Sequence, residues 1–193
     1  MRHLKLPLGM SDFEEIRQNG YYYIDKSGLI SDLLVRKAAK VTLITRPRRF
    51  GKTLGMSMLA HFFDIEKDSR ALFEGLEISK QKELCVQWMS QYPVIFITLK
   101  DMKKHTFENQ KAMFAILIQD IVRKNQELLE SEELNTFDKE QLIAYYRRTQ
   151  SDVDLQNALK FLCGCLKQHY HKDVILLIDE YDVPLQSAYL KGY

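Results

Sequence analysis

The sequence predicts an α/β fold in which a parallel sheet is flanked by helices, and three observations support this prediction. A short apolar run, Val41 to Thr45, stands before a basic loop and an amphipathic stretch. Two later apolar runs, Val94 to Leu99 and Val174 to Ile178, are separated from it and from each other by stretches with helical spacing of apolar residues. Strands that alternate with helices are typical of a parallel sheet covered on both faces.

The residues before the first predicted strand are expected to form an N-terminal segment, 1–40, that leads into a core at 41–193. Ser11 and Glu14 have the spacing of a capping box, which predicts the start of a short helix. Tyr21 to Ile24 is typical of a short extended run, and a second helix is predicted from Gly28 to Lys40.

The core is expected to contain several more helices. Apolar residues recur at helical spacing from Leu54 to Phe63, and we interpret this stripe as core packing. Three further helices are predicted: one around 114–122, one over 138–148, and one that starts at Ser151 with Asp154 as capping acid. The acidic and polar stretch 127–135 is expected to be a solvated loop. The His169-Tyr170-His171 run is also expected to be a solvated loop and not a metal site, because no third metal ligand accompanies the two histidines.

Composition limits the class of protein. The chain has 193 residues, of which 46% are hydrophobic and 28% charged, as expected for one globular domain. Its formal net charge of +2 does not favour a protein that coats nucleic acid. Its cysteines, Cys85, Cys163 and Cys165, are few and odd in number, which favours a reducing compartment. No apolar run approaches the roughly 18 residues that span a membrane. We therefore expect a cytoplasmic protein.

The most informative stretch is the basic loop from Arg46 to Thr53, which reads Arg-Pro-Arg-Arg-Phe-Gly-Lys-Thr. A strand, a loop that ends in Gly-Lys-Thr and a helix form the arrangement that binds nucleoside triphosphates. Lys52 would reach the β- and γ-phosphates, and the Thr53 hydroxyl would ligate Mg²⁺. The pattern GxxxxGK(S/T) has glycine where this chain has Arg46, so a basic turn that caps an ordinary helix is the alternative. The predicted nucleotide-binding residues are Arg48, Arg49, Phe50, Gly51, Lys52, Thr53 and Leu54; for Arg48 and Arg49 a solvated loop pair is equally compatible.

A pair of carboxylates, Asp179 and Glu180, follows the last predicted strand. Ligands of open α/β sheets bind at the carboxyl ends of strands, where this pair is expected to lie. In a P-loop ATPase the first acid holds Mg²⁺ and the second activates the attacking water, which assigns these roles to Asp179 and Glu180. The alternative is two solvated acids at a strand end. The two motifs together, in this order, predict a P-loop NTPase.

The chain resembles the AAA-ATPase-like family of bacterial proteins, whose members often carry a PD-(D/E)XK nuclease-like domain at the C-terminus. The segments that carry the resemblance are Leu6 to Phe13, Tyr23 to Ser27, Arg46 to Thr53 and Asp179 to Pro184. Arginine is common in that family at the position of Arg46. The family usually has Asp-Lys-Thr where this chain has Asp25-Lys26-Ser27, and serine keeps the hydroxyl.

The resemblance also implies that the fold continues past Tyr193, with further strands, a sensor residue, a lid and the nuclease-like domain. The P-loop NTPase fold is therefore expected to be C-terminally incomplete here. In such ATPases a later strand lies between the loop strand and the Asp-Glu strand. Without it, the sheet must close the gap or leave an open edge, which favours pairing with another chain.

The leading functional hypothesis is Mg²⁺-dependent binding and hydrolysis of ATP. Lys52 and Glu180 are the predicted catalytic residues, and Thr53 and Asp179 the predicted metal ligands. One alternative is a nucleotide-binding switch or interaction module without efficient hydrolysis. Another is a small-molecule kinase, against which Glu180 argues. ATP rather than GTP rests on the resemblance. The expected partners are ATP and a second copy or another protein; nucleic acid would enter only through a C-terminal domain, and no membrane is expected.

Overall fold

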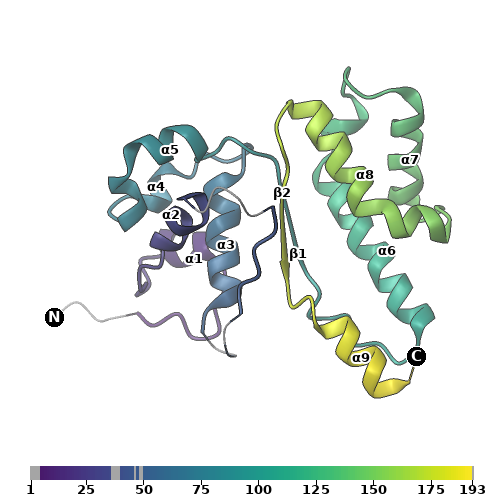
Figure 1. The fold of residues 1–193 in the computed structure, drawn as a ribbon, viewed down its shortest axis with the longest axis horizontal. Helices are drawn as coiled ribbons and strands as arrows, with labels where there is room; N and C mark the ends of the chain where they lie inside the picture. The colour runs from purple at the N-terminus through teal and green to yellow at the C-terminus, as the bar shows by residue number, and fades with distance from the viewer. Residues whose placement is uncertain (1–4, 36–39, 46, 48–49, 193) are drawn as a thin grey trace. The chain divides into compact units, whose positions relative to one another are not determined.

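The structure is a computed structural model that describes residues 5–35, 40–45, 47 and 50–192 (Figure 1). The chain divides into two compact units, residues 1–96 and 97–193, and each is described by itself. The strands β1 (Val94–Thr98) and β2 (Ile175–Asp179) form a two-stranded parallel sheet. The predicted strands over 94–99 and 174–178 are therefore confirmed, and the class is α/β.

The first unit is mostly helical. Its elements are α1 (Phe13–Gln18), α2 (Gly28–Val35), α3 (Lys52–Phe63), α4 (Arg70–Phe73), the 3₁₀ helix η1 (Glu77–Lys80) and α5 (Lys82–Trp88). α1 packs against α3, and Phe13 of α1 and Phe62 of α3 both contact the ring of Phe73 in α4. The Phe13 ring is fully buried, with its centroid 4.9 Å from that of Phe73 and 5.4 Å from that of Tyr23. Buried aromatic rings supply large apolar area, so this cluster stabilises the unit.

Helix α1 begins one residue later than the capping-box prediction. Its N-cap is Asp12, whose carboxylate accepts a hydrogen bond of 2.8 Å from the Glu15 N–H. The prediction that Ser11 caps the helix is therefore wrong. Ser11 with Glu14 and Asp12 with Glu15 have the same spacing, and the sequence pattern alone does not choose between them.

Helices α2 and α3 agree with the predicted helices in position but differ at their ends. The helix predicted over 28–40 is confirmed as α2, from Gly28 to Val35; residues 36–39 lie outside the described residues, and Lys40 is not helical. The helix predicted from Leu54 begins at Lys52. Its second half, Ser57 to Phe63, is entirely buried, which confirms that the apolar stripe packs in the core.

The prediction of a strand at Val41 to Thr45 is wrong. These residues form neither a strand nor a helix, and Val41 is 86% and Leu43 62% exposed. A strand is stable only when a neighbour satisfies its backbone N–H and C=O groups. Within the part of the chain that the structure describes, the sheet consists of β1 and β2, and neither pairs with this run. An apolar run therefore precedes the loop without the strand that the motif requires.

The second unit contains a bundle of helices next to β2. Its elements are α6 (Phe107–Lys124), the 3₁₀ helix η2 (Gln126–Leu129), α7 (Thr136–Arg147), α8 (Asp152–Tyr170), β2 and α9 (Val183–Lys191). α6 packs against both α7 and α8, as Figure 1 shows. Ser151 and Asp154 form the predicted capping box of α8.

Two loop predictions in the second unit are wrong in part. The stretch 127–135 includes part of η2 and buries Leu128 completely and Leu134 to 5% exposure, because these leucines fill the space beside the helices. His169 lies in the last turn of α8, where its Nδ1 is 2.8 Å from the Ser131 Oγ. A hydrogen-bonding role thus accounts for His169. Helix α9 was not predicted, although Pro184 in its first turn is a recognised start signal.

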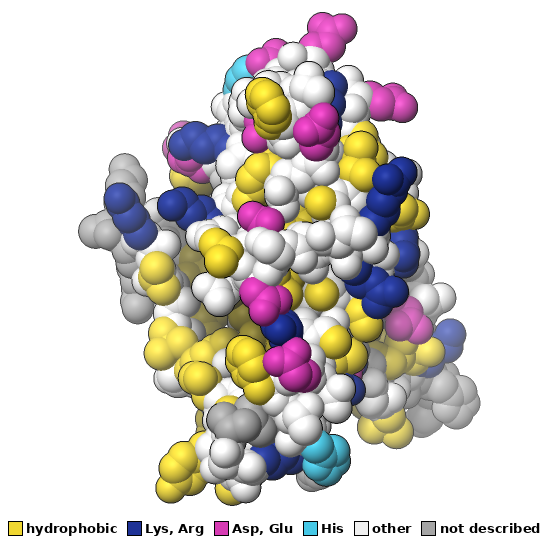
Figure 2. Space-filling view, turned by 90° about the vertical axis from the view of Figure 1, so that its right-hand side faces the viewer, with side chains coloured by type: hydrophobic (Ala, Val, Ile, Leu, Met, Phe, Trp, Pro, Cys, Tyr) yellow, Lys and Arg dark blue, Asp and Glu magenta, His cyan; other side chains and the backbone are white. Residues whose placement is uncertain are grey.

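The face of the second unit that is formed by its helices carries charged and hydrophobic side chains together. Figure 2 shows acidic and basic side chains interspersed there, with hydrophobic side chains between them. On α9 the side chains of Leu185, Tyr189 and Leu190 are exposed. Among the residues placed by the structure, no helix combines the length and the apolar character needed to cross a membrane.

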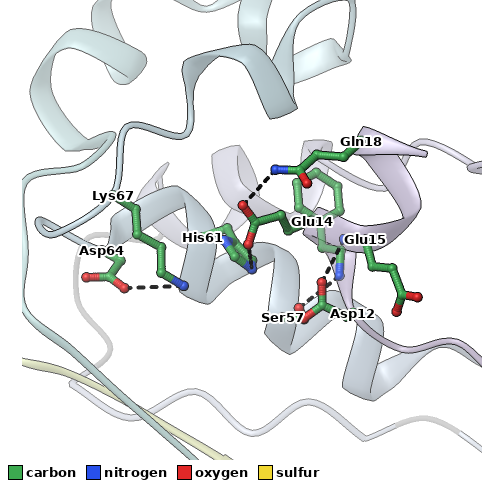
Figure 3. A network of polar contacts seen from close by, with 9 residues as sticks. Asp12, Glu14, Glu15, Gln18, Ser57, His61, Asp64 and Lys67 are labelled. Atoms are coloured by element: carbon green, nitrogen blue, oxygen red, sulfur yellow. Dashed lines mark hydrogen bonds and ion pairs between the residues drawn. The ribbon is translucent and has the colours of Figure 1, made fainter. Parts of the chain in front are cut away.

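The contact between α1 and α3 also carries a polar network (Figure 3). The Phe13 N–H donates to the Ser57 Oγ over 3.0 Å. On the same side of α3, His61 is only 5% exposed, with its Nε2 3.9 Å from a carboxylate oxygen of Glu14. The His61 Nδ1 is buried and lacks a hydrogen-bond partner among the described atoms. Burial of an imidazole in this position favours its neutral form.

The pKa of His61 follows from these surroundings. Burial lowers it below its ordinary value, and the charge of Lys67 lowers it further. The carboxylates of Glu14, Asp12 and Asp64 act in the opposite direction but do not reverse the shift. The folded protein therefore holds this proton less tightly than the unfolded chain does.

We expect this difference to appear as a loss of stability in mild acid. The unfolded chain binds more protons at His61 below its ordinary pKa of 6.5, so the free energy of unfolding falls as the pH drops through that value. Well above that value, His61 is neutral in both the folded and the unfolded state and adds nothing to the pH dependence of the free energy of unfolding. Urea unfolding of wild type and His61→Gln at about pH 7.5 and about pH 5.5 measures this term. A steeper loss in wild type is expected; equal slopes in the two proteins would contradict it.

Candidate functional site

The loop that ends at Gly51 leads directly into α3. Gly51 is the N-cap of α3, with φ of 75°, in the left-handed region that favours glycine. Its carbonyl accepts the first helical hydrogen bond, 2.9 Å from the Gly55 N–H. A side chain at position 51 would be strained at this φ, and its Cβ would lie 3.4 Å from the Lys26 Nζ. The local fold therefore explains why the motif has glycine here.

The start of α3 has the chemistry of an anion site. The first N–H groups of a helix have no partner within the helix, and they carry its partial positive charge. Gly51 has no side chain to cap them. Lys52 adds a full positive charge as the first residue of the helix, and Thr53 and Leu54 follow it, all three half-buried. A phosphate at this position would be bound by both backbone and side chain.

The remaining predicted loop residues divide into two groups. Phe50 is 59% exposed, and its carbonyl accepts a hydrogen bond of 2.9 Å from the Lys26 ammonium. Arg46, Arg48 and Arg49 lie outside the described residues, so their predicted phosphate contacts stay predictions. No role was assigned to Lys26 from the sequence, although a lysine between two residues that can anchor the backbone, Asp25 and Ser27, just before a helix, indicates a fixed position.

The acidic pair lies where β2 ends. Asp179 is the last residue of β2 and 5% exposed, and its carbonyl accepts from the Leu99 N–H over 3.0 Å. Its carboxylate accepts from the Glu180 N–H over 3.1 Å. The expectation of a strand buried on both faces is wrong for Leu176, which is 37% exposed, since the sheet has only two strands among the residues described.

Glu180 has an unusual backbone conformation. Its φ is 55°, in the left-handed region. Among the residues that the structure describes, the others in this region that are not glycine are Ser90, Arg148 and His171, and each stands at or just after the end of a helix, where this conformation is common. Glu180 instead follows a strand, and its carbonyl accepts from the Val183 N–H in the turn before α9. A non-glycine residue held in this region is found more often at functional sites than elsewhere.

The two halves of the predicted site belong to different units. Gly51, Lys52 and Thr53 lie in the first unit and Asp179 and Glu180 in the second. Their joint arrangement around a nucleotide is therefore a prediction. In the described ranges no group of three or more His, Cys, Asp or Glu residues could hold a metal ion. Thr53 and Asp179 would bind Mg²⁺ only with phosphate oxygens and water as further ligands, which is how Mg²⁺ usually binds beside nucleotides.

The first unit also contains a polar hollow of about 420 Å³. It is lined by Glu14, Arg17, Gln18, His61, Lys67, Asp68, Ser69, Ala71 and Leu72. None of the predicted site residues is among them. The hollow is thus separate in composition from the loop, and its charged groups are balanced in sign.

Comparisons with known proteins bear on the whole chain. The family model described as Predicted AAA-ATPase matches residues 7–192. The chain is also 34% identical over 99 residues to an uncharacterized protein in the vnfD 5' region of Azotobacter chroococcum mcd 1. That match covers 51% of this chain and 17% of the relative, so the chain spans a small part of the relative's length. No solved structure matches the chain.

The family match includes both motif regions described above, the loop before α3 and the acids after β2. It extends over nearly the whole chain, from the segment before α1 to the end of α9. The chain therefore belongs to the family described as Predicted AAA-ATPase.

Proposed function

We propose that the chain is a P-loop module that binds ATP with Mg²⁺ and hydrolyses it. The observation that carries the proposal is the Gly51 turn, with φ of 75°, from which α3 begins at Lys52. This is the backbone that a Gly-Lys-Thr motif needs in order to direct helix N–H groups and a lysine at one phosphate chain. Membership of a family of predicted ATPases supports the choice of nucleotide.

The binding half of the proposal rests on the first unit. The N–H groups at the start of α3 would bind the β-phosphate, and Lys52 would neutralise charge on the β- and γ-phosphates. Arg48, Arg49, Phe50 and Leu54 would complete the phosphate-binding loop. The Thr53 hydroxyl would take one position around Mg²⁺, with phosphate oxygens and water in others.

The catalytic half rests on the second unit. Asp179 is held at the end of β2 with its carboxylate buried, which suits a group that binds a hydrated Mg²⁺. Glu180 is fixed by a left-handed backbone and would orient and polarise the attacking water. Hydrolysis of this kind depends on positioning and electrostatics, so the two units must present these groups to one phosphate chain. The few, unpaired cysteines favour the cytoplasm as its compartment.

A second candidate function is a nucleotide-binding switch without efficient hydrolysis. The observation that favours it is the exposed, irregular run Val41 to Thr45 in place of a strand before the loop. A loop without a strand behind it can bind phosphate through α3, but it holds the reacting groups less precisely. Loss of about an ångström of precision lowers catalysis more than binding. A second copy or another protein that pairs with this run would then restore turnover.

Replacing Lys52 tests the binding half. We expect Lys52→Ala to weaken Mg-ATP binding by about tenfold to a hundredfold, because a charge-assisted contact to phosphate is lost. Isothermal titration calorimetry measures the affinity. Lys82→Ala, which removes the same charge from an exposed position of the same unit, is the control for charge and should bind as wild type does. Unchanged affinity in Lys52→Ala would show that the loop is a basic turn and not a phosphate site.

Replacing Glu180 tests the catalytic half. We expect Glu180→Gln to keep Mg-ATP affinity and to lower the rate of phosphate release by about a hundredfold or more, since a positioned base contributes that much. Asp173→Asn, at an exposed acid just before β2, is the control and should keep the wild-type rate. If Glu180→Gln turns over at the wild-type rate, Glu180 is not the base. If wild type itself binds ATP without turnover, the switch is the better description.

A further inference from the structure

One side chain outside the Gly-Lys-Thr motif contacts the loop directly. The Lys26 ammonium donates to the Phe50 carbonyl oxygen over 2.9 Å, across 24 residues of sequence. The same nitrogen would be 3.4 Å from a Cβ placed on Gly51. Lys26 is therefore packed against the peptide group that links Phe50 to Gly51, immediately before α3.

The backbone on both sides of Lys26 is fixed to η1. The Asp25 carboxylate accepts from the Ser27 N–H over 2.8 Å and from the Glu77 N–H over 2.7 Å. The Ser27 hydroxyl is fully buried and accepts from the Ile78 N–H over 3.1 Å. These bonds fix the backbone at position 26, so the contact with the loop has to order the Lys26 side chain but not the chain that carries it.

The charge of Asp25 supports this anchoring. Loss of solvent contact alone would raise the pKa of its carboxyl group. Hydrogen bonds from Ser27 and from the Glu77 N–H, with the charge of Arg17, outweigh that effect and lower the pKa below its ordinary value. Asp25 is therefore ionised at neutral pH, and hydrogen bonds to an ionised acceptor are stronger than those between neutral groups.

The geometry of a peptide bond turns this contact into a constraint on the loop. In a trans peptide the C=O of one residue and the N–H of the next point in opposite directions. No described peptide bond is cis. When Lys26 holds the Phe50 carbonyl, the Gly51 N–H is directed away from Lys26. In a phosphate-binding loop it is the N–H groups that must face the ligand.

We propose that Lys26 is a positioning residue of the phosphate-binding loop. It holds the Phe50 carbonyl so that the Gly51 N–H and the start of α3 face the β-phosphate of a nucleoside diphosphate or triphosphate. The Asp25-Lys26-Ser27 run is thus a support in which Asp25 and Ser27 bind η1 and Lys26 binds the loop. This inference rests on the proposed nucleotide site and adds to it a residue outside the Gly-Lys-Thr motif.

The test compares Lys26→Met with wild type in the binding of ATP, ADP and AMP by calorimetry. Methionine keeps the unbranched shape and most of the length of the lysine side chain but cannot donate a hydrogen bond. We expect affinity for ATP and ADP to fall by about tenfold, the effect of losing one charge-assisted hydrogen bond. AMP, which has no β-phosphate, should bind equally to both proteins. Lys26→Arg keeps a donor and should recover most of the loss, and Lys82→Met is the matched control for charge.

Salt distinguishes positioning from simple charge attraction. A charge effect is screened and should largely disappear between about 0.05 M and about 0.5 M NaCl, whereas a misoriented loop persists at both. We expect the difference between Lys26→Met and wild type to persist. Melting curves without nucleotide show whether Lys26→Met is folded. If it is not, Lys26→Arg is used instead: the inference predicts that this protein still prefers ADP to AMP as wild type does, and loss of that preference in a folded Lys26→Arg protein would overturn it.

Several outcomes would overturn the inference. A loss that vanishes in high salt, or that is equal for AMP and ATP, would show that Lys26 does not orient the loop. If wild type binds ATP and Lys52→Ala does not, but Lys26→Met binds as wild type does, the inference fails and the proposed function stands. If wild type binds neither ATP nor ADP, both fail together.

Discussion

The burial of the second half of α3 is the constraint on which the rest of the first unit depends. From Ser57 to Phe63 every residue of α3 is buried, and the rings of Phe62 in α3 and Phe13 in α1 both contact the Phe73 ring. A helix that is fixed at its buried end has a defined direction at its other end. The turn at Gly51 and the N–H groups that follow are therefore placed by core packing, and a charged ligand can use them without paying to order them.

Polar contacts hold the residues around the loop before α3 and at the end of β2. Asp25 and Ser27 bind the segment before α2 to η1, and the Lys26 side chain extends from this segment to the loop. In the second unit Asp179 is held at the end of β2 by the hydrogen bond from the Leu99 N–H to its carbonyl. Glu180, the next residue, has a left-handed backbone conformation. In the proposed function, the first unit would supply the phosphate-binding residues and the second unit the acidic pair.

Much of this organisation could be predicted from local patterns, and the misses have physical causes. Helical spacing predicted α3, and capping chemistry predicted the start of α8, because both depend on residues close in sequence. The run Val41 to Thr45 has strand composition, yet a strand requires a neighbour, and periodicity does not reveal whether one is present. The contact between Lys26 and Phe50 joins segments distant in sequence, which no local pattern records. The predicted roles of Arg48 and Arg49 remain predictions.

Hydrogen–deuterium exchange with and without Mg²⁺ and a non-hydrolysable ATP analogue measures whether nucleotide phosphates bind at the start of α3. We expect slower exchange in peptides that contain Gly51 to Leu54, where ligand phosphates would accept hydrogen bonds from the backbone N–H groups. A smaller effect is expected around Asp179 and Glu180, through Mg²⁺. Unchanged exchange at the start of α3, with protection confined to other segments such as those that line the hollow beside His61, would show that nucleotide does not bind at the Gly-Lys-Thr motif.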